Sequence, residues 1–192
     1  MKQKITGIMI VMLLQWGNIV FAQQQRSAEV SYNPNAKSDT SKRSIKSAAV
    51  NKIAAATVTI NYYSPGVRGR AIWGGLVTYG KVWVSGAHFA TNIEIDKDFV
   101  VNGVAIQKGK YAIFTIPNKT EWTVIINKKW NQHLTDDYQQ SEDIVRIKVK
   151  PKQQKLNTER LQYFITDKGN NKGSIVMAWG KLKIGFELSI IK

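Results

Sequence analysis

The sequence predicts an all-β protein, a single-domain antiparallel β-sandwich or barrel-like fold of about nine to ten short strands. From residue 57 onward, apolar and polar residues alternate over short segments, which is the period of a half-buried strand. Turn residues separate these segments. No long amphipathic helical pattern occurs, and only residues 128–138 carry a weak one.

The expected strands can be placed from local signals. The strongest is a β-hairpin at residues 99–106, because Asn102-Gly103 supplies the two positive φ angles of a type I′ turn. The alternation breaks at Ile144, where a bulge is expected. The other strands are expected at residues 57–63, 81–85, 92–96, 110–116, 122–127, 143–149, 160–166, 174–179 and 181–191.

The first 22 residues have the pattern of an export signal. Lys2 and Lys4 precede an apolar stretch, and Ala22 closes a small-residue cleavage site, which makes Gln23 the expected mature N-terminus. An uncleaved anchor helix is the alternative, but the apolar stretch is short and interrupted. We therefore expect an exported, periplasmic or extracellular protein with no transmembrane segment after cleavage. It must fold without disulfides, since the chain has no cysteine.

Residues 23–52 are rich in Gln, Ser, Asn and Lys and show little apolar periodicity. Such a segment buries too little surface to offset its ordering entropy. We expect a disordered polar linker here, with at most a short helix near residues 44–49. The folded all-β domain is expected at residues 53–192.

The chain is strongly basic, with a formal net charge of +15. The signal segment carries two lysines and no acid, so the mature chain keeps +13. For an exported protein, such a charge favours glycans or anionic envelope components as partners over nucleic acid. The lysines are scattered along the sequence, however, and a solvated surface is the preferred interpretation.

No catalytic, metal or cofactor motif stands out. The two histidines, His88 and His133, are far apart in sequence and have no third ligand nearby, whereas zinc sites need three or four. We expect no metal and no cofactor. A non-enzymatic binding or structural module of the cell envelope is the favoured interpretation. The alternative is a hydrolase with a site around His88 and Glu94.

The glycine-rich loop at residues 64–80 is the most unusual stretch. Arg68 and Arg70 flank Gly69 within it, and arginines beside free backbone amides can form an anion site. Alternatively, an arginine can brace the loop by donating to its carbonyls or pairing with Glu94. We expect Arg70 to be a buried brace and Arg68 to be the exposed arginine.

The remaining candidates are aromatic. Most tryptophans fall in expected strands and belong to the core, whereas Trp73 and Trp130 fall in loops. An open groove lined by either of these two would favour ligand binding, whereas a cleft holding His88 beside a carboxylate or hydroxyl would favour an enzyme. The candidate ligand-binding residues are Arg68, Arg70, Trp73, His88 and Trp130.

Three motifs carry a resemblance: SPGVRGRAIWGGLVTYGKVW, SGAHFATNIEI and VNGVAIQKGKYAIFTIPNKTEWTVIINKKWNQ. They resemble a family of small exported bacterial proteins catalogued as domain of unknown function 2911, over about residues 55–191. The resemblance implies no activity, substrate or catalytic residue. The family pattern places Arg-Thr after Trp83 and Asn-Glu before Ala90, where this chain has Val84-Ser85 and His88-Phe89. These departures put any family-wide function in doubt here, whereas Arg70 matches the pattern.

Overall fold

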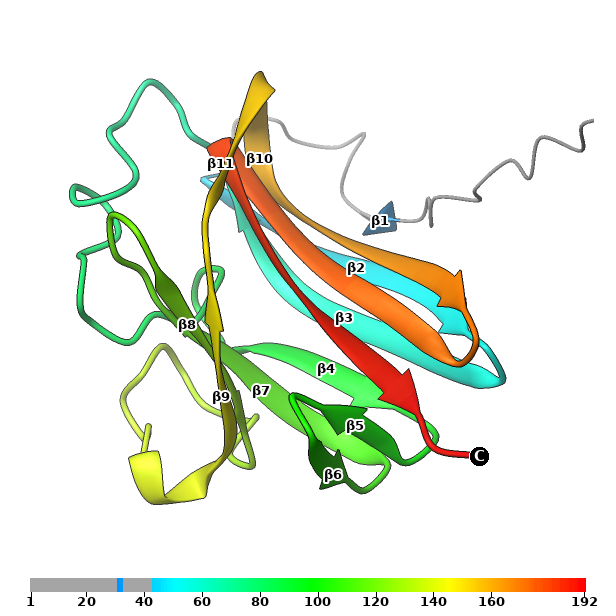
Figure 1. The fold of residues 1–192 in the computed structure, drawn as a ribbon. Helices are drawn as coiled ribbons and strands as arrows, with labels where there is room; N and C mark the ends of the chain where they lie inside the picture. Colours follow the sequence, from blue (N-terminus) through cyan, green and yellow to red (C-terminus); the bar gives the residue numbers. More distant parts are fainter. Residues whose placement is uncertain (1–30, 33–42) are drawn as a thin grey trace, which may run out of the picture.

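The computed structural model describes residues 31–32 and 43–192, which form two packed antiparallel sheets (Figure 1). The larger sheet has the order β1-β2-β3-β4-β7-β8-β9, and the smaller has the order β10-β11-β5-β6. The predicted all-β sandwich is therefore confirmed. The strands are β1 (Ser31–Tyr32), β2 (Ser44–Ile53), β3 (Ala56–Pro65), β4 (Thr91–Ile95), β5 (Phe99–Val101), β6 (Val104–Ile106), β7 (Gly109–Ile116), β8 (Trp122–Asn127), β9 (Asp143–Val149), β10 (Lys152–Gly169) and β11 (Lys172–Ile190).

The main core lies between the two sheets. On β3 the inward positions alternate as Val58, Ile60 and Tyr62, and all three are buried. Trp122 of the larger sheet and Trp179 of the smaller sheet are also almost completely buried. Burying one large apolar side chain contributes about 1.5–3 kcal/mol, so this shared interior is the main source of stability in a chain without disulfides.

The expected linker is wrong over its last residues, because residues 44–52 belong to β2. This strand pairs with β3 over its whole length, from Ser44↔Pro65 to Ile53↔Ala56. The short helix expected near residues 44–49 is therefore wrong as well. Ile45 and Ile53 are buried near the two ends of β2, but the inward positions between them include Ser47 and Ala49, so the middle of the strand lacks the large apolar residues that reveal a strand. The proposed boundary at residue 53 cuts through a core element.

The last two strands are longer than predicted. The strands expected at 174–179 and 181–191 are one continuous strand, β11, and the strand expected at 160–166 lies within β10. Gly180, with φ of 60°, lies opposite Thr158 where the register shifts, so an irregularity replaces the expected break. β10 also contacts β3, since Ser64 Oγ donates to the Leu161 carbonyl at 2.7 Å.

Local turn chemistry was predicted well. Asn102 and Gly103 have φ of 49° and 80°, and they join β5 to β6 as the type I′ signal predicts. The bulge expected at Ile144 is confirmed, because Ile126 pairs with Val145 whereas Asn127 pairs with Asp143.

One expected strand and the one weak helical candidate are wrong. The strand at 81–85 is reduced to one bridge, in which Trp83 and Thr115 exchange two backbone hydrogen bonds of 2.8 and 3.0 Å. Residues 128–138 form no helix and instead run as a loop against the segment before β4. There Leu134 N donates to the His88 carbonyl at 2.6 Å, and Ala90 N donates to the Gln132 carbonyl at 3.0 Å. These two loops cover one end of the outer face of the larger sheet.

Candidate functional site

A groove of about 380 Å³ lies on the outer face of the larger sheet, and we call it the sheet-face groove. Its floor consists of outward-facing positions of β2, β3, β4 and β7, and the loops before β4 and after β8 form one wall. Its lining residues are Lys46, Asn61, Tyr62, Tyr63, Phe89, Ala90, Asn92, Lys110, Trp130 and Asn131.

The strand register brings the floor amides of the sheet-face groove together. Asn61 of β3 lies directly opposite Asn92 of β4, and Asn61 Nδ2 donates to Asn92 Oδ1 at 3.3 Å. An asparagine amide carries two N–H donors and a carbonyl acceptor with two lone pairs, so this bond leaves capacity on both residues. Asn131 adds a third amide from the wall. The groove therefore presents paired donors and acceptors at fixed spacing.

The same groove carries unusually exposed aromatic surface. Phe89 is 50% exposed and Trp130 is 37% exposed. The Tyr63 ring stacks with Phe89 at a centroid distance of 6.3 Å, and Lys110 Nζ lies 4.2 Å from the centre of the Trp130 ring. Exposed aromatic faces of this size are costly in water unless they meet a partner. Among the sequence candidates, Trp130 is the one that the structure places in this groove.

A second cavity, of about 310 Å³, lies under the glycine-rich loop, and we call it the loop pocket. It brings together Arg70 and His88, two of the candidates, with Arg43. The other lining residues are Ser44, Pro65, Leu76, Val77, Trp83, Val84, Gly86, Ala87, Leu134 and Trp179.

Arg70 braces its loop as expected, but it does so from the surface. Its Nε donates to the Val67 carbonyl at 3.1 Å, and its Nη2 donates to the Gly66 carbonyl at 2.5 Å. The expectation that the brace would be buried is wrong, because Arg70 is exposed. It also does not pair with Glu94, which forms a 3.9 Å ion pair with Lys110.

Arg68 is exposed, as expected, and lies at the start of the same loop. Its φ is 50°, and its backbone N–H donates to Glu159 Oε1 at 2.9 Å. This bond ties the loop to β10. Arg68 therefore lies on the opposite flank of the loop from the loop pocket, in a shallow depression lined by β10 residues.

Trp73 is not an open binding face. Its ring centroid lies 4.6 Å from that of Trp122, 5.7 Å from that of Trp83 and 5.7 Å from that of Trp179. The half-buried loop residue thus completes a tryptophan cluster that closes one end of the sandwich core. Within the described residues, the indole Nε1 atoms of Trp73, Trp122 and Trp179 have no hydrogen-bond partner.

His88 and Glu94 do not form a catalytic pair in the structure. His88 has φ of 60°, is exposed, and packs edge-on against Tyr63 with a centroid distance of 5.1 Å. No hydrogen bond joins its ring to a carboxylate or hydroxyl in the part of the chain that is described. Since general acid–base catalysis needs such a contact, the hydrolase alternative gains no geometric support.

Asp143 is the centre of a structural hydrogen-bond network near Tyr138. Asp143 accepts hydrogen bonds from Asn127 at 2.7 Å, Tyr138 at 2.8 Å and Arg146 at 2.7 Å. Burial raises the pKa of Tyr138, and its hydrogen bond to Asp143 adds to the rise. The network fastens the loop after β8 to β9. No group of three or more potential metal ligands occurs among the described residues.

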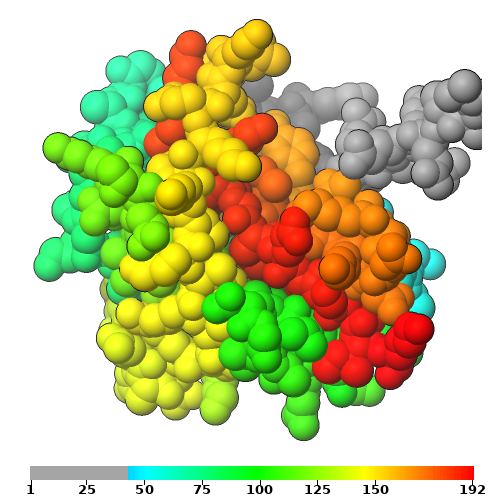
Figure 2. Space-filling view, viewed as in Figure 1, coloured from blue at the N-terminus to red at the C-terminus, as the bar shows by residue number. Residues whose placement is uncertain are grey.

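A third depression, of about 450 Å³, gathers lysines that are dispersed in the sequence, and we call it the lysine groove. Lys148 lies on β9, Lys150 lies in the connection to β10, and Lys152 starts β10. Lys168 and Lys183 come from β10 and β11. Figure 2 shows this face, with the end of β9 beside β11. Two of these lysines are paired, Lys148 with Glu121 at 3.4 Å and Lys168 with Glu187 at 2.5 Å.

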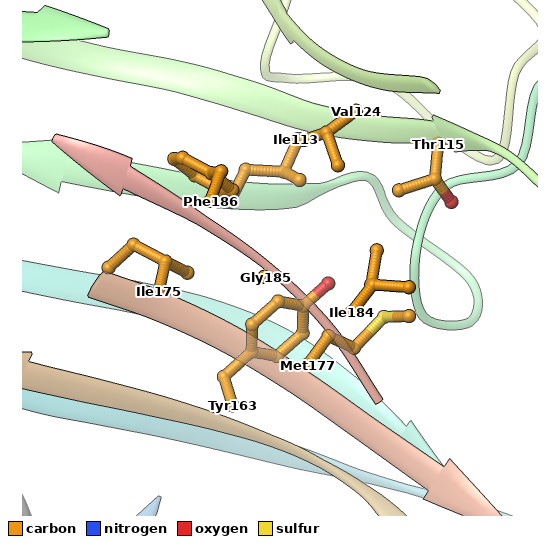
Figure 3. A pocket seen from close by; sticks show the side chains of 9 residues that line it. All are labelled: Ile113, Thr115, Val124, Tyr163, Ile175, Met177, Ile184, Gly185 and Phe186. Atoms are coloured by element: carbon orange, nitrogen blue, oxygen red, sulfur yellow. The ribbon is translucent and has the colours of Figure 1, made fainter. Parts of the chain in front are cut away.

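The interior between the sheets offers no space for a ligand. Figure 3 shows the small void there, surrounded by apolar side chains such as Ile113, Met177 and Phe186. Its volume of about 10 Å³ is at the limit for a single water molecule. Thr115 and Tyr163 are the residues of its lining that carry a hydroxyl, and the Tyr163 hydroxyl donates to the Ser85 carbonyl at 2.8 Å. Any binding must therefore use the surface cavities.

Comparison with known proteins assigns the family. The family model described as "Protein of unknown function (DUF2911)" matches residues 44–188, from the start of β2 almost to the end of β11. The chain belongs to this family. Neither the curated proteins nor the solved structures contain a match. The DUF2911 match includes β2, which supports counting that strand as part of the domain. In the described part of the chain, no helix is long and apolar enough to cross a membrane.

Proposed function

We propose that this DUF2911 protein is an exported, non-enzymatic binding module of the cell envelope, and that its sheet-face groove binds a glycan. One observation carries the proposal: an open groove combines three aromatic rings outside the core with three asparagine amides, namely Tyr63, Phe89, Trp130, Asn61, Asn92 and Asn131. Sugar rings present apolar C–H faces and many hydroxyl groups. Exposed rings can stack against the former, and amides can both donate to and accept from the latter.

The chemistry of the groove also supports binding over catalysis. Its lining contains no Asp, Glu, His, Ser or Cys, so it lacks the paired carboxylates of a glycosidase and the nucleophile–base pair of an acyl hydrolase. Lys46 and Lys110 lie at its ends and favour a glycan that carries carboxylate or sulfate groups.

Binding to a panel of neutral and uronate-containing oligosaccharides tests this function. With the full chain, calorimetry is expected to detect one class of oligosaccharide, and Trp130→Ala is expected to weaken binding at least tenfold, since base–aromatic stacking of comparable area contributes about 1–3 kcal/mol. Phe164→Ala is the matched control, because Phe164 is also an exposed aromatic side chain but lies on β10, outside the groove. Equal loss in both variants, or no oligosaccharide binding, would contradict the proposal.

Export is the second part of the proposal and rests on the signal pattern of residues 1–22. Mass spectrometry of the protein from its native host is expected to give a mature N-terminus at or near Gln23. Finding Met1 intact on the native protein would refute cleavage.

A further inference from the structure

We propose that the loop pocket is a second binding site, specific for a small organic acid whose apolar, preferably aromatic, body carries one carboxylate. The site is distinct from the sheet-face groove, since the lining residues of the two cavities do not overlap. The segment that contains His88 and Phe89 separates them, with His88 on one side and Phe89 on the other.

The walls of the loop pocket fit an apolar body. Two tryptophans, Trp83 and Trp179, line it together with aliphatic side chains. Leu76 and Leu134 are 48% and 41% exposed, so apolar surface remains open to the cavity mouth instead of being closed into the core. A volume of about 310 Å³ is at the lower end of the range for small-molecule sites, about 300–1,000 Å³.

The charges of the pocket all have the same sign. Arg43 and Arg70 both line it, and no Asp or Glu does. Among the described residues, the Arg43 side chain forms no hydrogen bond or ion pair, and Arg70 bonds only to carbonyls. Two exposed guanidinium groups without a counter-charge beside an apolar wall favour an anion, because an opposite charge is attracted to both of them.

Backbone contacts hold the two arginines in place. Gly66 N donates to the Arg43 carbonyl at 3.2 Å, and the Gly66 carbonyl accepts from Arg70 Nη2 at 2.5 Å. Gly66 therefore anchors the backbone of Arg43 and the guanidinium of Arg70. Of the five N–H donors of Arg70, those on Nη1 carry no hydrogen bond to the described residues. They remain available to a carboxylate at the pocket mouth.

The opposite wall is equally fixed, so the pocket is preformed. A Cβ on Gly86 would lie 2.8 Å from Thr91 Oγ1 and 3.1 Å from the Tyr63 carbonyl, which shows how closely this segment is packed. The preceding carbonyl, of Ser85, accepts hydrogen bonds from Tyr163 at 2.8 Å and Thr91 at 3.0 Å. A preformed site loses little conformational entropy on binding, which favours a small rigid ligand.

Aromatic carboxylates are the direct probes. Phenylacetate and indole-3-acetate are titrated into the full chain, with the neutral amides of both acids and with acetate as controls. Calorimetry gives the affinity of each acid, and a change in tryptophan fluorescence on adding phenylacetate, which has no indole ring, reports contact with Trp83 and Trp179. We expect the two acids to bind with Kd below about 1 mM, and the amides and acetate to bind at least tenfold more weakly.

Arg43→Gln is the deciding variant, because the Arg43 side chain makes no bond whose loss would disturb the fold. This variant is expected to leave the thermal unfolding midpoint unchanged and to weaken the binding of both aromatic acids at least tenfold. Lys150→Gln, which removes one positive charge from the lysine groove, is the matched control and is expected to leave the affinity within twofold. Equal binding of acid and amide, unchanged affinity in Arg43→Gln, or absence of binding would overturn the proposal. Loss of acid binding in Trp130→Ala instead would place the ligand in the sheet-face groove and would overturn it too.

Discussion

The contact between Gly173 and Ile53 offers a sharp test of the packing of β2 against β11. Gly173 is buried on β11, and a Cβ built on it would lie 2.3, 2.7 and 2.9 Å from Cδ1, Cγ1 and Cγ2 of Ile53. Ile53, the last residue of β2, is itself fully buried. Carbon atoms in good contact are about 3.5–4.0 Å apart, so Gly173→Ala forces Ile53 to move by about 1 Å within a packed core. Overpacking of this kind costs about 1–3 kcal/mol.

The effect of Gly173→Ala on the free energy of unfolding should change sign when Ile53 is replaced by a smaller residue. Ile53→Ala alone is expected to cost about 2–5 kcal/mol, because it removes three buried carbons and leaves a cavity. In that background the three clashing atoms are gone. The new methyl group at residue 173 then fills part of the cavity, and replacing a strand glycine by alanine adds about 0.5–1 kcal/mol by reducing unfolded-state entropy. Gly173→Ala should therefore stabilise Ile53→Ala although it destabilises the wild type.

Wild type, Gly173→Ala, Ile53→Ala and the double variant form a double-mutant cycle, and urea unfolding gives the free energy of unfolding of each protein. Constant m-values would show that the unfolded state is unchanged. We expect a coupling energy of about 2 kcal/mol or more. Ile126→Ala on β8 is the control background, because it is also a fully buried isoleucine but does not contact residue 173. Additive effects within about 0.5 kcal/mol would refute the packing of β2 on β11.

Two further predictions concern surface groups. Arg70→Ala is expected to lower the free energy of unfolding by about 1–2 kcal/mol, since two hydrogen bonds to carbonyls are lost at an exposed site where water can replace them. An unchanged urea midpoint would contradict the conclusion that Arg70 braces the loop. Asp96 accepts a 2.8 Å bond from Thr57 N, and this bond lowers its pKa. Because the folded-state pKa is depressed, the resulting stability is present above the unfolded pKa and is lost as pH falls through the folded one. Asp96→Asn should therefore flatten the dependence of the thermal midpoint on pH between about pH 2 and 5. The same dependence in variant and wild type would contradict a stabilising role for the Asp96 carboxylate.

The fold class could be predicted from the sequence because most strands have one buried and one polar face. β2 could not, since Ser47 and Ala49 occupy inward positions where a strand signal needs larger apolar residues. Ser47 tolerates burial because its hydroxyl donates to the Ile45 carbonyl at 3.2 Å. The short strand expected around Trp83 has alternation but only Thr115 as a bridge partner. The alternation of apolar and polar residues predicts which side chains can face a core. Whether a segment forms a strand also depends on a neighbouring strand that accepts and donates its backbone hydrogen bonds.

The candidate sites show the same limit. Trp130 was predicted from its aromatic surface and its position in a loop, and the sheet-face groove contains it. Asn61 and Asn92 were not predicted, because ordinary strand asparagines become a paired feature only through the β3–β4 register. The lysines were interpreted as a solvated surface because they are scattered in sequence. The consecutive strands β9, β10 and β11 fold so that Lys168 and Lys183 lie in one groove with the lysines of residues 148–152, and the spacing of the lysines in the sequence does not report that.

The two departures from the family pattern fall in the walls of the two proposed sites. Val84, at the place of the expected arginine, is 2% exposed, packs with Phe114 and Ile125, and lines the loop pocket. Phe89, at the place of the expected glutamate, lines the sheet-face groove. A charged pair at these positions would add an arginine to the first cavity and remove an aromatic face from the second. We therefore expect a charged residue at either position to change the binding that is proposed for that cavity. Val84→Arg and Phe89→Glu, made separately and together, would show whether each cavity depends on its own departure.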